Sequence, residues 1–392
     1  MRPARRSAAA AVLLCAAALA LAGDPPPPPP SLAGADAKAR IALAQELEKK
    51  DVQGLVRALD ALALSKTKDA DRDFLVQYAM QERDRGLRMS ALAALARLDR
   101  KAASDWFKAR ADGKEELPTV VALEALARLG TKDDAAVPIE LIKSANELVA
   151  VAAADCAARL AAPKECEAIA ENGLAHPSEH VTNHAAWAVQ DVLKKPKLAI
   201  ALFEKFASKK SDPRSIRAGA TVALLQDKVA DPHEWGDTLF PVKELLLNAP
   251  AAIEIKAANK EFKANVQAAL DWLKTNMPAA ELLVRAAAKR IDAPGSKRPD
   301  DWVDLDTDMI LVPVDRASWK PNLLAFHIFW MGSVLFEKRC GEPAKSHRGW
   351  EPAMFDVYDL CVIAHLYDAG PGGYSRSNFM KDQVAKHPWG SQ

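Results

Sequence analysis

The sequence has few cysteines, few aromatic residues and almost no net charge. Cysteine supplies 5 of the 392 residues, and Phe, Trp and Tyr together supply only 6%. The 53 Lys and Arg residues nearly balance the 52 Asp and Glu residues, which leaves a net charge of +1. A balanced chain lacks the basic surface that binding to nucleic acid or to an anionic membrane requires. We therefore expect neither as a partner.

The sequence also lacks the short motifs that mark common enzyme classes. It contains no Gly-x-Ser-x-Gly, no phosphate-binding loop, no dinucleotide glycine fingerprint and no His-Glu-x-x-His. It therefore indicates no enzyme class and no cofactor. Beyond the N-terminus no hydrophobic run is long enough to cross a bilayer, because the longest, residues 148–162, is interrupted by Asp155 and Arg159.

Residues 1–22 are typical of a secretory signal peptide. A positively charged start is followed by an apolar core at 8–19 and by the small-x-small cleavage site Ala20-Leu21-Ala22. Cys15 raises the alternative of a lipoprotein, but Leu14 stands where that class requires a small residue. We expect cleavage after Ala22 and a periplasmic or extracellular chain.

Residues 23–36 form a proline-rich linker. The six prolines at 25–30 fix an extended polyproline II segment, because each ring sets φ and removes a backbone donor. We interpret this segment as a stiff spacer, with a docking ligand for an aromatic groove as the alternative.

Residues 37–292 show one helical pattern repeated along the chain. Abundant Ala, Leu and Val with few Thr and Tyr favour helix over sheet, so the expected class is all-α. Residues 91–98 (ALAALARL) match residues 122–129 (ALEALARL) at an offset of 31, and the same offset leads to Arg159-Leu160. Looser copies follow at 185–189 and 217–225. A period of 31 to 35 residues is typical of a helical solenoid.

The segments 87–95 and 213–224 resemble the second helix of the HEAT repeat, with a branched residue, an arginine and an Ala-x-x-Ala-Leu core. The short period is similar to the bacterial form of that repeat. The resemblance implies an α-solenoid over about 250 residues and a surface that binds a protein or peptide partner. Further copies fade after Leu193, where the stretch 251–277 keeps only helical periodicity.

Residues 293–392 differ in composition and are expected to form a small aromatic-rich domain or a cap on the array. They hold 13 of the 24 aromatic residues. The sequence predicts a short edge strand at 309–314 and helices that begin at Pro321 and Pro352. Part of this region is similar to a hairpin of terpenoid cyclases and prenyltransferases, over about 50 residues and without a catalytic motif.

Two groups of residues have the spacing of metal sites, although we predict no metal. His176, His180 and His184 recur every four residues, and we interpret them as a structural row rather than zinc ligands. The second group has the spacing of a calcium loop, but Met309 stands where that loop needs glycine, so we expect a solvated acidic loop. Its members are Asp304, Asp306, Asp308 and Asp315.

Cys156 and Cys166 are the candidates for a disulfide. The expected hairpin would place them at similar heights on neighbouring helices. Cys340 and Cys361 would lie too far apart in a simple hairpin.

The composition and the resemblance lead to one main functional hypothesis and one alternative. The main hypothesis is an exported scaffold that presents a groove of the array to a protein or peptide. The alternative is a ligand-binding or enzymatic site at the junction of the array and the C-terminal region, lined by His327, Trp330 and His365.

Overall fold

The computed structural model describes residues 31–32, 36–81, 84–227, 239–256, 259–295 and 302–341. Within these residues the chain is mostly helical, which confirms the predicted class, and four short strands are added to the helices. The helices are α2 Ala37–Lys50, α3 Val52–Leu62, α4 Lys68–Gln81, α5 Arg85–Lys108, α6 Glu116–Leu129, α7 Ala136–Leu141, α8 Glu147–Leu160, α9 Cys166–Ala175, α10 Glu179–Leu193, α11 Pro196–Ala207, α12 Ser215–Asp227, α13 Phe240–Leu247, α14 Lys260–Asn276, α15 Pro278–Ala287 and α16 Pro321–Arg339.

The helices begin where short polar side chains or prolines can start them. Asp36 Oδ1 accepts a hydrogen bond from Ala39 N at 3.0 Å, and Asn146 Oδ1 accepts one from Leu148 N at 3.0 Å. Pro321 is the first residue of α16, where its missing N–H costs nothing. The predicted start of this helix is confirmed.

The repeated sequence motif coincides with helices that pack side by side. Residues 91–98 lie in α5, and residues 122–129 end α6. α5 bends at Asp99, which has φ −162° and ψ 78°, and Asp99 Oδ1 accepts a hydrogen bond from Ala102 N at 3.1 Å. The bend makes residues 100–108 a separate helical segment, which precedes α6 along the chain.

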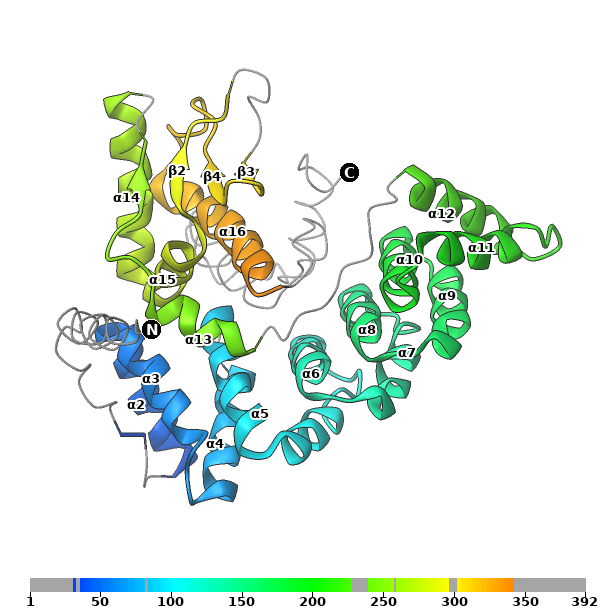
Figure 1. Cartoon of the computed structure of the whole chain (residues 1–392), viewed down its shortest axis with the longest axis horizontal. Helices are drawn as coiled ribbons and strands as arrows, with labels where there is room; N and C mark the ends of the chain where they lie inside the picture. The colour runs from blue at the N-terminus through cyan, green and yellow to red at the C-terminus, as the bar shows by residue number, and fades with distance from the viewer. Residues whose placement is uncertain are drawn as a thin grey trace, which may run out of the picture.

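From α5 onward the chain forms successive helix pairs that follow an arc (Figure 1). α6 contacts α5 and α8, α8 contacts α10, and α10 contacts α12, while α7, α9 and α11 pack on the other side of the arc. The buried side chains between them are mainly Ala, Val and Leu, which let neighbouring helices approach closely.

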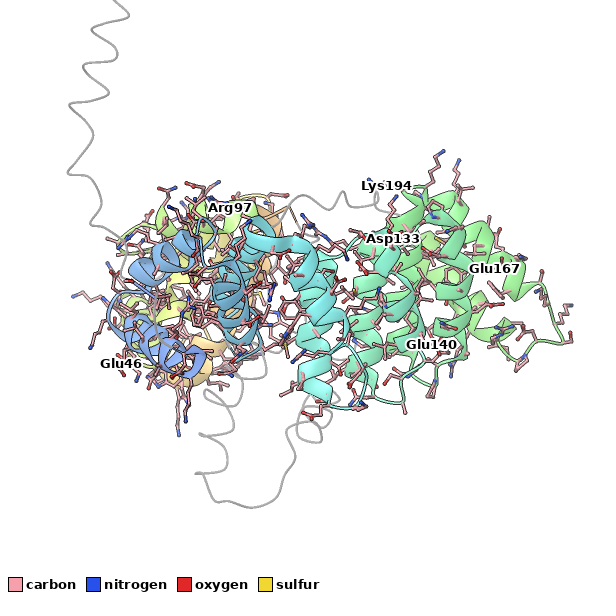
Figure 2. The ribbon with its side chains drawn as sticks, turned by 90° about the horizontal axis from the view of Figure 1, so that it is seen from below. Glu46, Arg97, Asp133, Glu140, Glu167 and Lys194 are labelled. Atoms are coloured by element: carbon pink, nitrogen blue, oxygen red, sulfur yellow. The ribbon has the colours of Figure 1, made fainter. Side chains whose placement is uncertain are left out.

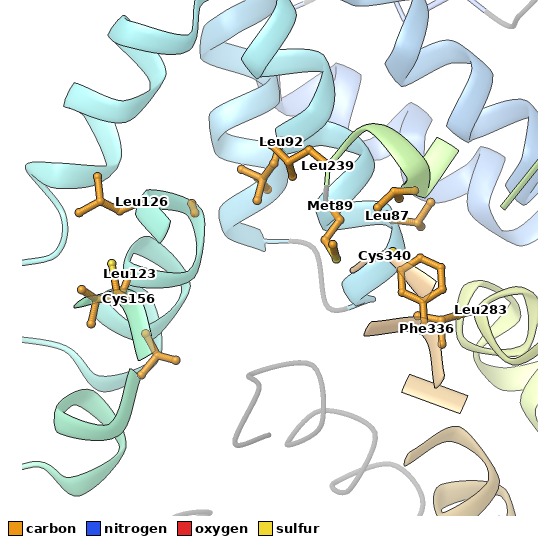
Figure 3. Close-up of a cluster of buried hydrophobic side chains, with 14 of the residues drawn as sticks. Leu87, Met89, Leu92, Leu123, Leu126, Cys156, Leu239, Leu283, Phe336 and Cys340 are labelled. Atoms are coloured by element: carbon orange, nitrogen blue, oxygen red, sulfur yellow. The ribbon is translucent and has the colours of Figure 1, made fainter. Parts of the chain in front are cut away.

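The helices near the end of the described chain pack against those near its beginning. α13 contacts α3 and α5, and α15 contacts α2, α3 and α5. Gln53 Nε2 donates to the carbonyl oxygens of Leu246 and Leu247 at 3.2 Å. Figure 3 shows Leu87 of α5 near Leu239, with Phe336 of α16 close by. One buried hydrophobic cluster therefore joins α2–α5 to α13–α16.

A small sheet lies beside α14 and α16 (Figure 1). Its strands are β1 Glu254–Ile255, β2 Arg290–Asp292, β3 Val303–Asp304 and β4 Met309–Leu311, in the order β1-β2-β4-β3. β1 and β4 run parallel to β2, and β3 runs antiparallel to β4. The boundary predicted at residue 292 is the last residue of β2, so strands from both sides of it share this sheet.

Two local predictions need correction here. β4 is an interior strand rather than an edge strand, because it pairs with β2 on one side and with β3 on the other. Pro313 does not interrupt this pairing, since the strand ends at Leu311. The helix predicted from residue 251 begins only at Lys260, because residues 254–255 pair with β2 and Asn259 Oδ1 caps the helix at Phe262 N, 2.7 Å away.

Candidate functional site

Buried charged side chains of α5 and α6 bind one another. Arg88 of α5 donates through Nη1 to Glu124 Oε2 of α6, and Arg128 Nη1 lies 3.6 Å from Glu124 Oε1. Arg88 is 0% exposed and Glu124 is 9% exposed. Charges that are buried and paired in this way fix the register of neighbouring helices, so we assign them a structural role.

The predicted row of histidines joins neighbouring helices. His184 Nδ1 of α10 lies 2.9 Å from Asp155 Oδ1 of α8, and His176 Nε2 lies 2.9 Å from the Ser144 carbonyl oxygen. The rings of His180 and His184 are 4.6 Å apart. Among the residues that the structure describes, no three His, Cys, Asp or Glu side chains are grouped to hold a metal ion.

Cys156 and Cys166 are buried free thiols, so the predicted disulfide is not formed in the structure. Burial raises the pKa of Cys166 to about 11 and also raises that of Cys156. Both thiols are therefore protonated and unreactive at neutral pH. Cys340 is likewise buried and free, while Cys361 lies outside the described residues.

The predicted acidic loop forms the turn between β3 and β4. Asp304 Oδ1 accepts hydrogen bonds from the backbone N of Asp306 and Thr307 at 3.0 and 3.3 Å. Asp308 lies 2.8 Å from Lys338 Nζ and 3.2 Å from Lys289 Nζ. Burial alone would raise the pKa of Asp308, but these two lysines outweigh it and lower the pKa. The Asp308 carboxylate is therefore paired with two lysine ammonium groups.

His327 lies among aromatic rings rather than in an open pocket. It is 3% exposed, stacks on Trp302 at 4.7 Å between ring centroids and lies 5.0 Å from Trp319. Trp330 packs edge-on against Phe326 at 5.7 Å. His365, the third residue expected at a junction site, lies outside the described residues, as does the helix predicted from Pro352.

A cavity lies where α13, α15 and α16 meet, but the residues that line it do not include His327 or Trp330. It has a volume of about 560 Å³ between α13, the end of α15 and the last turn of α16. Its lining consists of Pro241, Glu244, Leu245, Asn248, Pro250, Arg285, Ala286, Ala288, Lys289 and Arg339. Three cationic side chains and one carboxylate therefore face a mostly apolar hollow.

The second candidate surface is the open face of α12, at the far end of the arc (Figure 1). Ile216 is 84% exposed, the highest value among the large hydrophobic residues that the structure describes as exposed. Gly219, Ala220 and Ala223 are also exposed and follow at helical spacing. We call these four residues the α12 face. Contacts with α10 and α11 cover the other sides of this helix.

The segment that leads into α12 is basic in sequence, and two of its cations are paired, Lys205 with Glu167 and Arg214 with Asp212. Residues 194–217 contain eight Lys or Arg residues and two acidic residues, Glu204 and Asp212. Lys195, Lys197 and Lys209 are exposed. Figure 2 shows Lys194, which follows α10, on the upper edge of the helices in that view. A chain with a net charge of only +1 thus concentrates positive charge at this end.

Sequence reasoning missed both surfaces. The cavity depends on contacts between helices that are far apart in the chain, which no local pattern shows. The α12 face had a signal, because Ile216-x-x-Gly219-Ala220-x-x-Ala223 has the spacing of one helix face. From sequence alone this pattern predicts one more buried repeat, since burial of the face depends on whether another helix pair follows.

In the described residues no helix is both long and apolar enough to cross a membrane. No family model, no curated protein and no solved structure matches this chain.

Proposed function

We propose that the protein is an exported scaffold, a HEAT-like α-solenoid that binds a helix of a protein partner. The solenoid is supported by the offset of 31 residues between successive motifs and by the contacts of α6, α8, α10 and α12 in that order. Export is supported by the features of residues 1–22, which point to the periplasm or the cell exterior as the place of action.

The single observation that carries the proposal is the exposed α12 face. Each helix pair of a repeat array covers the apolar side of the pair before it, and terminal repeats usually carry a polar cap. α12 instead exposes Ile216 beside a shallow surface made of Gly219 and Ala220. Such a surface fits the larger apolar side chains of an incoming helix.

The charge around the α12 face sets the chemistry of this partner. The exposed lysines of residues 194–217 would attract an acidic segment and speed its association. We therefore propose an amphipathic helix with an apolar stripe flanked by Asp and Glu.

The inner side of the arc offers less free surface than the groove implied by the resemblance. Along the helices that succeed one another on this side, α6 and α8 have no exposed residue and α10 exposes only Glu179. A partner there would have to displace side chains that are already covered. This burial favours the end of the array over its inner side.

The test is capture from an envelope extract of the source organism with residues 23–392 as bait. Ile216→Glu should abolish capture of the partner, because it places a charge on the apolar face and repels an acidic helix. Leu43→Glu is the matched control, since Leu43 is 43% exposed on α2 and lies in another part of the molecule. This control should capture the partner like the unmodified chain.

The identity of the captured protein decides the outcome. A partner with an acidic amphipathic helix, whose synthetic peptide binds the unmodified chain but not Ile216→Glu, supports the proposal. Equal capture by both variants would overturn it. Light scattering provides a second check. If the unmodified chain self-associates and Ile216→Glu does not, the proposal is also overturned, because the occupant of the α12 face would then be a second copy.

A further inference from the structure

The junction cavity has the size and wall of a small-molecule site. Its volume of about 560 Å³ lies within the range of roughly 300–1,000 Å³ that is usual for ligand pockets. Pro241 and Leu245 of α13, Pro250 of the following loop and Ala288 after α15 supply apolar atoms to its lining. This lining can hold an apolar group.

Arg339 gives the cavity a fixed positive charge. Its Nη1 donates to the carbonyl oxygens of Ala286 and Ala287, at the end of α15. Within the described part of the chain no carboxylate forms an ion pair with it. The guanidinium is therefore held at the cavity wall through Nη1, its Nη2 and Nε donate no hydrogen bond within the described residues, and Arg339 as a whole is exposed.

The other two cations differ in how far they are neutralised. Arg285 Nε lies 2.6 Å from Glu281 Oε1, so a carboxylate balances its charge. Lys289 shares the single carboxylate of Asp308 with Lys338. Two ammonium groups with one carboxylate between them leave an excess of positive charge beside Arg339.

The fourth charge of the lining does not cancel this excess. The side chain of Glu244 is 67% exposed and lies 3.8 Å from Lys243 Nζ. Solvent therefore screens the charges of Glu244 and of the 68% exposed Lys289 to a similar degree, and the lining keeps three cations against one carboxylate.

We propose that the cavity binds a small organic anion. The anionic group would lie against Arg339 and Lys289, and the apolar remainder would contact Leu245 and the two prolines. This site is separate from the α12 face, so neither proposal depends on the other.

A pair of fluorescent probes tests the charge and the apolar wall separately. 1-Anilinonaphthalene-8-sulfonate carries an anionic group, and N-phenyl-1-naphthylamine has the same rings without it. We expect the sulfonate to bind residues 23–392 at least about tenfold more tightly than the neutral amine, because a charge-assisted hydrogen bond adds more than 1 kcal/mol. The titrations are repeated with Ile216→Glu, so that binding of either probe to the α12 face is recognised.

Arg339→Gln removes the charge but keeps an amide that can donate to the carbonyl oxygens of α15. It should weaken binding of the sulfonate about tenfold and leave the neutral probe unchanged. Lys101→Gln is the control, because this 85% exposed lysine pairs with Asp105 on α5 and does not line the cavity. It should change neither affinity.

A cavity-filling variant keeps the proposal testable if Arg339→Gln unfolds. Leu245→Trp should lower the affinity for both probes, with the melting curve by circular dichroism as a check of folding. Equal affinities for the two probes would overturn the proposal. So would sulfonate binding that is unchanged in both folded variants.

Discussion

His184 Nδ1 and Asp155 Oδ1 lie 2.9 Å apart and join α10 to α8. The histidine is fully buried, while the Asp155 side chain is 25% exposed. Asp155→Ala should lower the free energy of unfolding by about 1–3 kcal/mol, because the buried ring loses a hydrogen-bond partner. Asp105→Ala removes an exposed pair with Lys101 and should cost less than about 1 kcal/mol. Equal losses in urea unfolding would contradict a structural role for this histidine.

Gly173 permits the close approach of α9 and α10. A Cβ at this position would lie 2.3 Å from Ala185 Cβ, whereas a Cβ at Gly219 would meet nothing within 4 Å. Gly173→Ala should therefore destabilise the fold by about 1–3 kcal/mol. Gly219→Ala should stabilise it by about 0.5–1 kcal/mol, because alanine favours helix. Thermal unfolding of the two variants should shift in opposite directions, and a shift in the same direction would contradict the packing.

Asp71 makes stability depend on acid pH. Its Oδ1 lies 2.6 Å from Arg40 Nη2, and both side chains are nearly fully buried. Burial alone would raise the pKa of Asp71, but hydrogen bonds from Ser65, Thr67 and Arg40 outweigh it and lower the pKa. The ionised folded state is thus favoured above the ordinary pKa of 3.8, and this stability is lost as the pH falls through the lowered value.

The matching variant is Asp71→Asn. It should lower the free energy of unfolding by about 2 kcal/mol at pH 7, because hydrogen bonds to a charged group are lost. The gap in free energy of unfolding between this variant and the unmodified protein, measured by urea titration, should narrow as the pH falls from 5 to below 3. A gap that stays constant over this range would show that the ionised carboxylate does not contribute.

The buried thiols should resist modification. Because the pKa of Cys166 is raised to about 11, almost no thiolate exists at pH 8, and the same holds for Cys156. Iodoacetamide should label neither residue in the folded protein and both in urea, as read by peptide mass spectrometry. A peptide pair linked by a Cys156–Cys166 disulfide would contradict the structure and restore the pairing expected from the sequence.

Local patterns predicted the helices well because helix periodicity and caps lie within a few residues of each other. The Ala-Leu motifs of α5 and α6 and the proline that starts α16 are such signals. The return of α13 to α3 was not predictable, because Gln53 and Leu246 are far apart in the chain and share no local pattern. The short strands were also missed where two residues, such as Glu254 and Ile255, pair only with distant partners.

The same limit applies to the candidate sites. Sequence spacing drew attention to His184 and Asp308. The side chain of His184 binds Asp155 of a neighbouring helix, and that of Asp308 binds a lysine. The residues that line the cavity, among them Arg285 and Arg339, belong to no motif. Their proximity arises from how α13, α15 and α16 pack, which depends on tertiary contacts.

The most direct test of the scaffold proposal is hydrogen–deuterium exchange of residues 23–392 with and without the captured partner. We predict slower exchange over residues 215–227 in the complex and unchanged exchange over α2. The slowing over residues 215–227 should diminish above physiological salt, because charge attraction assists binding. Protection confined to α6 and α8, with α12 unaffected, would place the partner on the inner side of the arc and contradict docking at the α12 face.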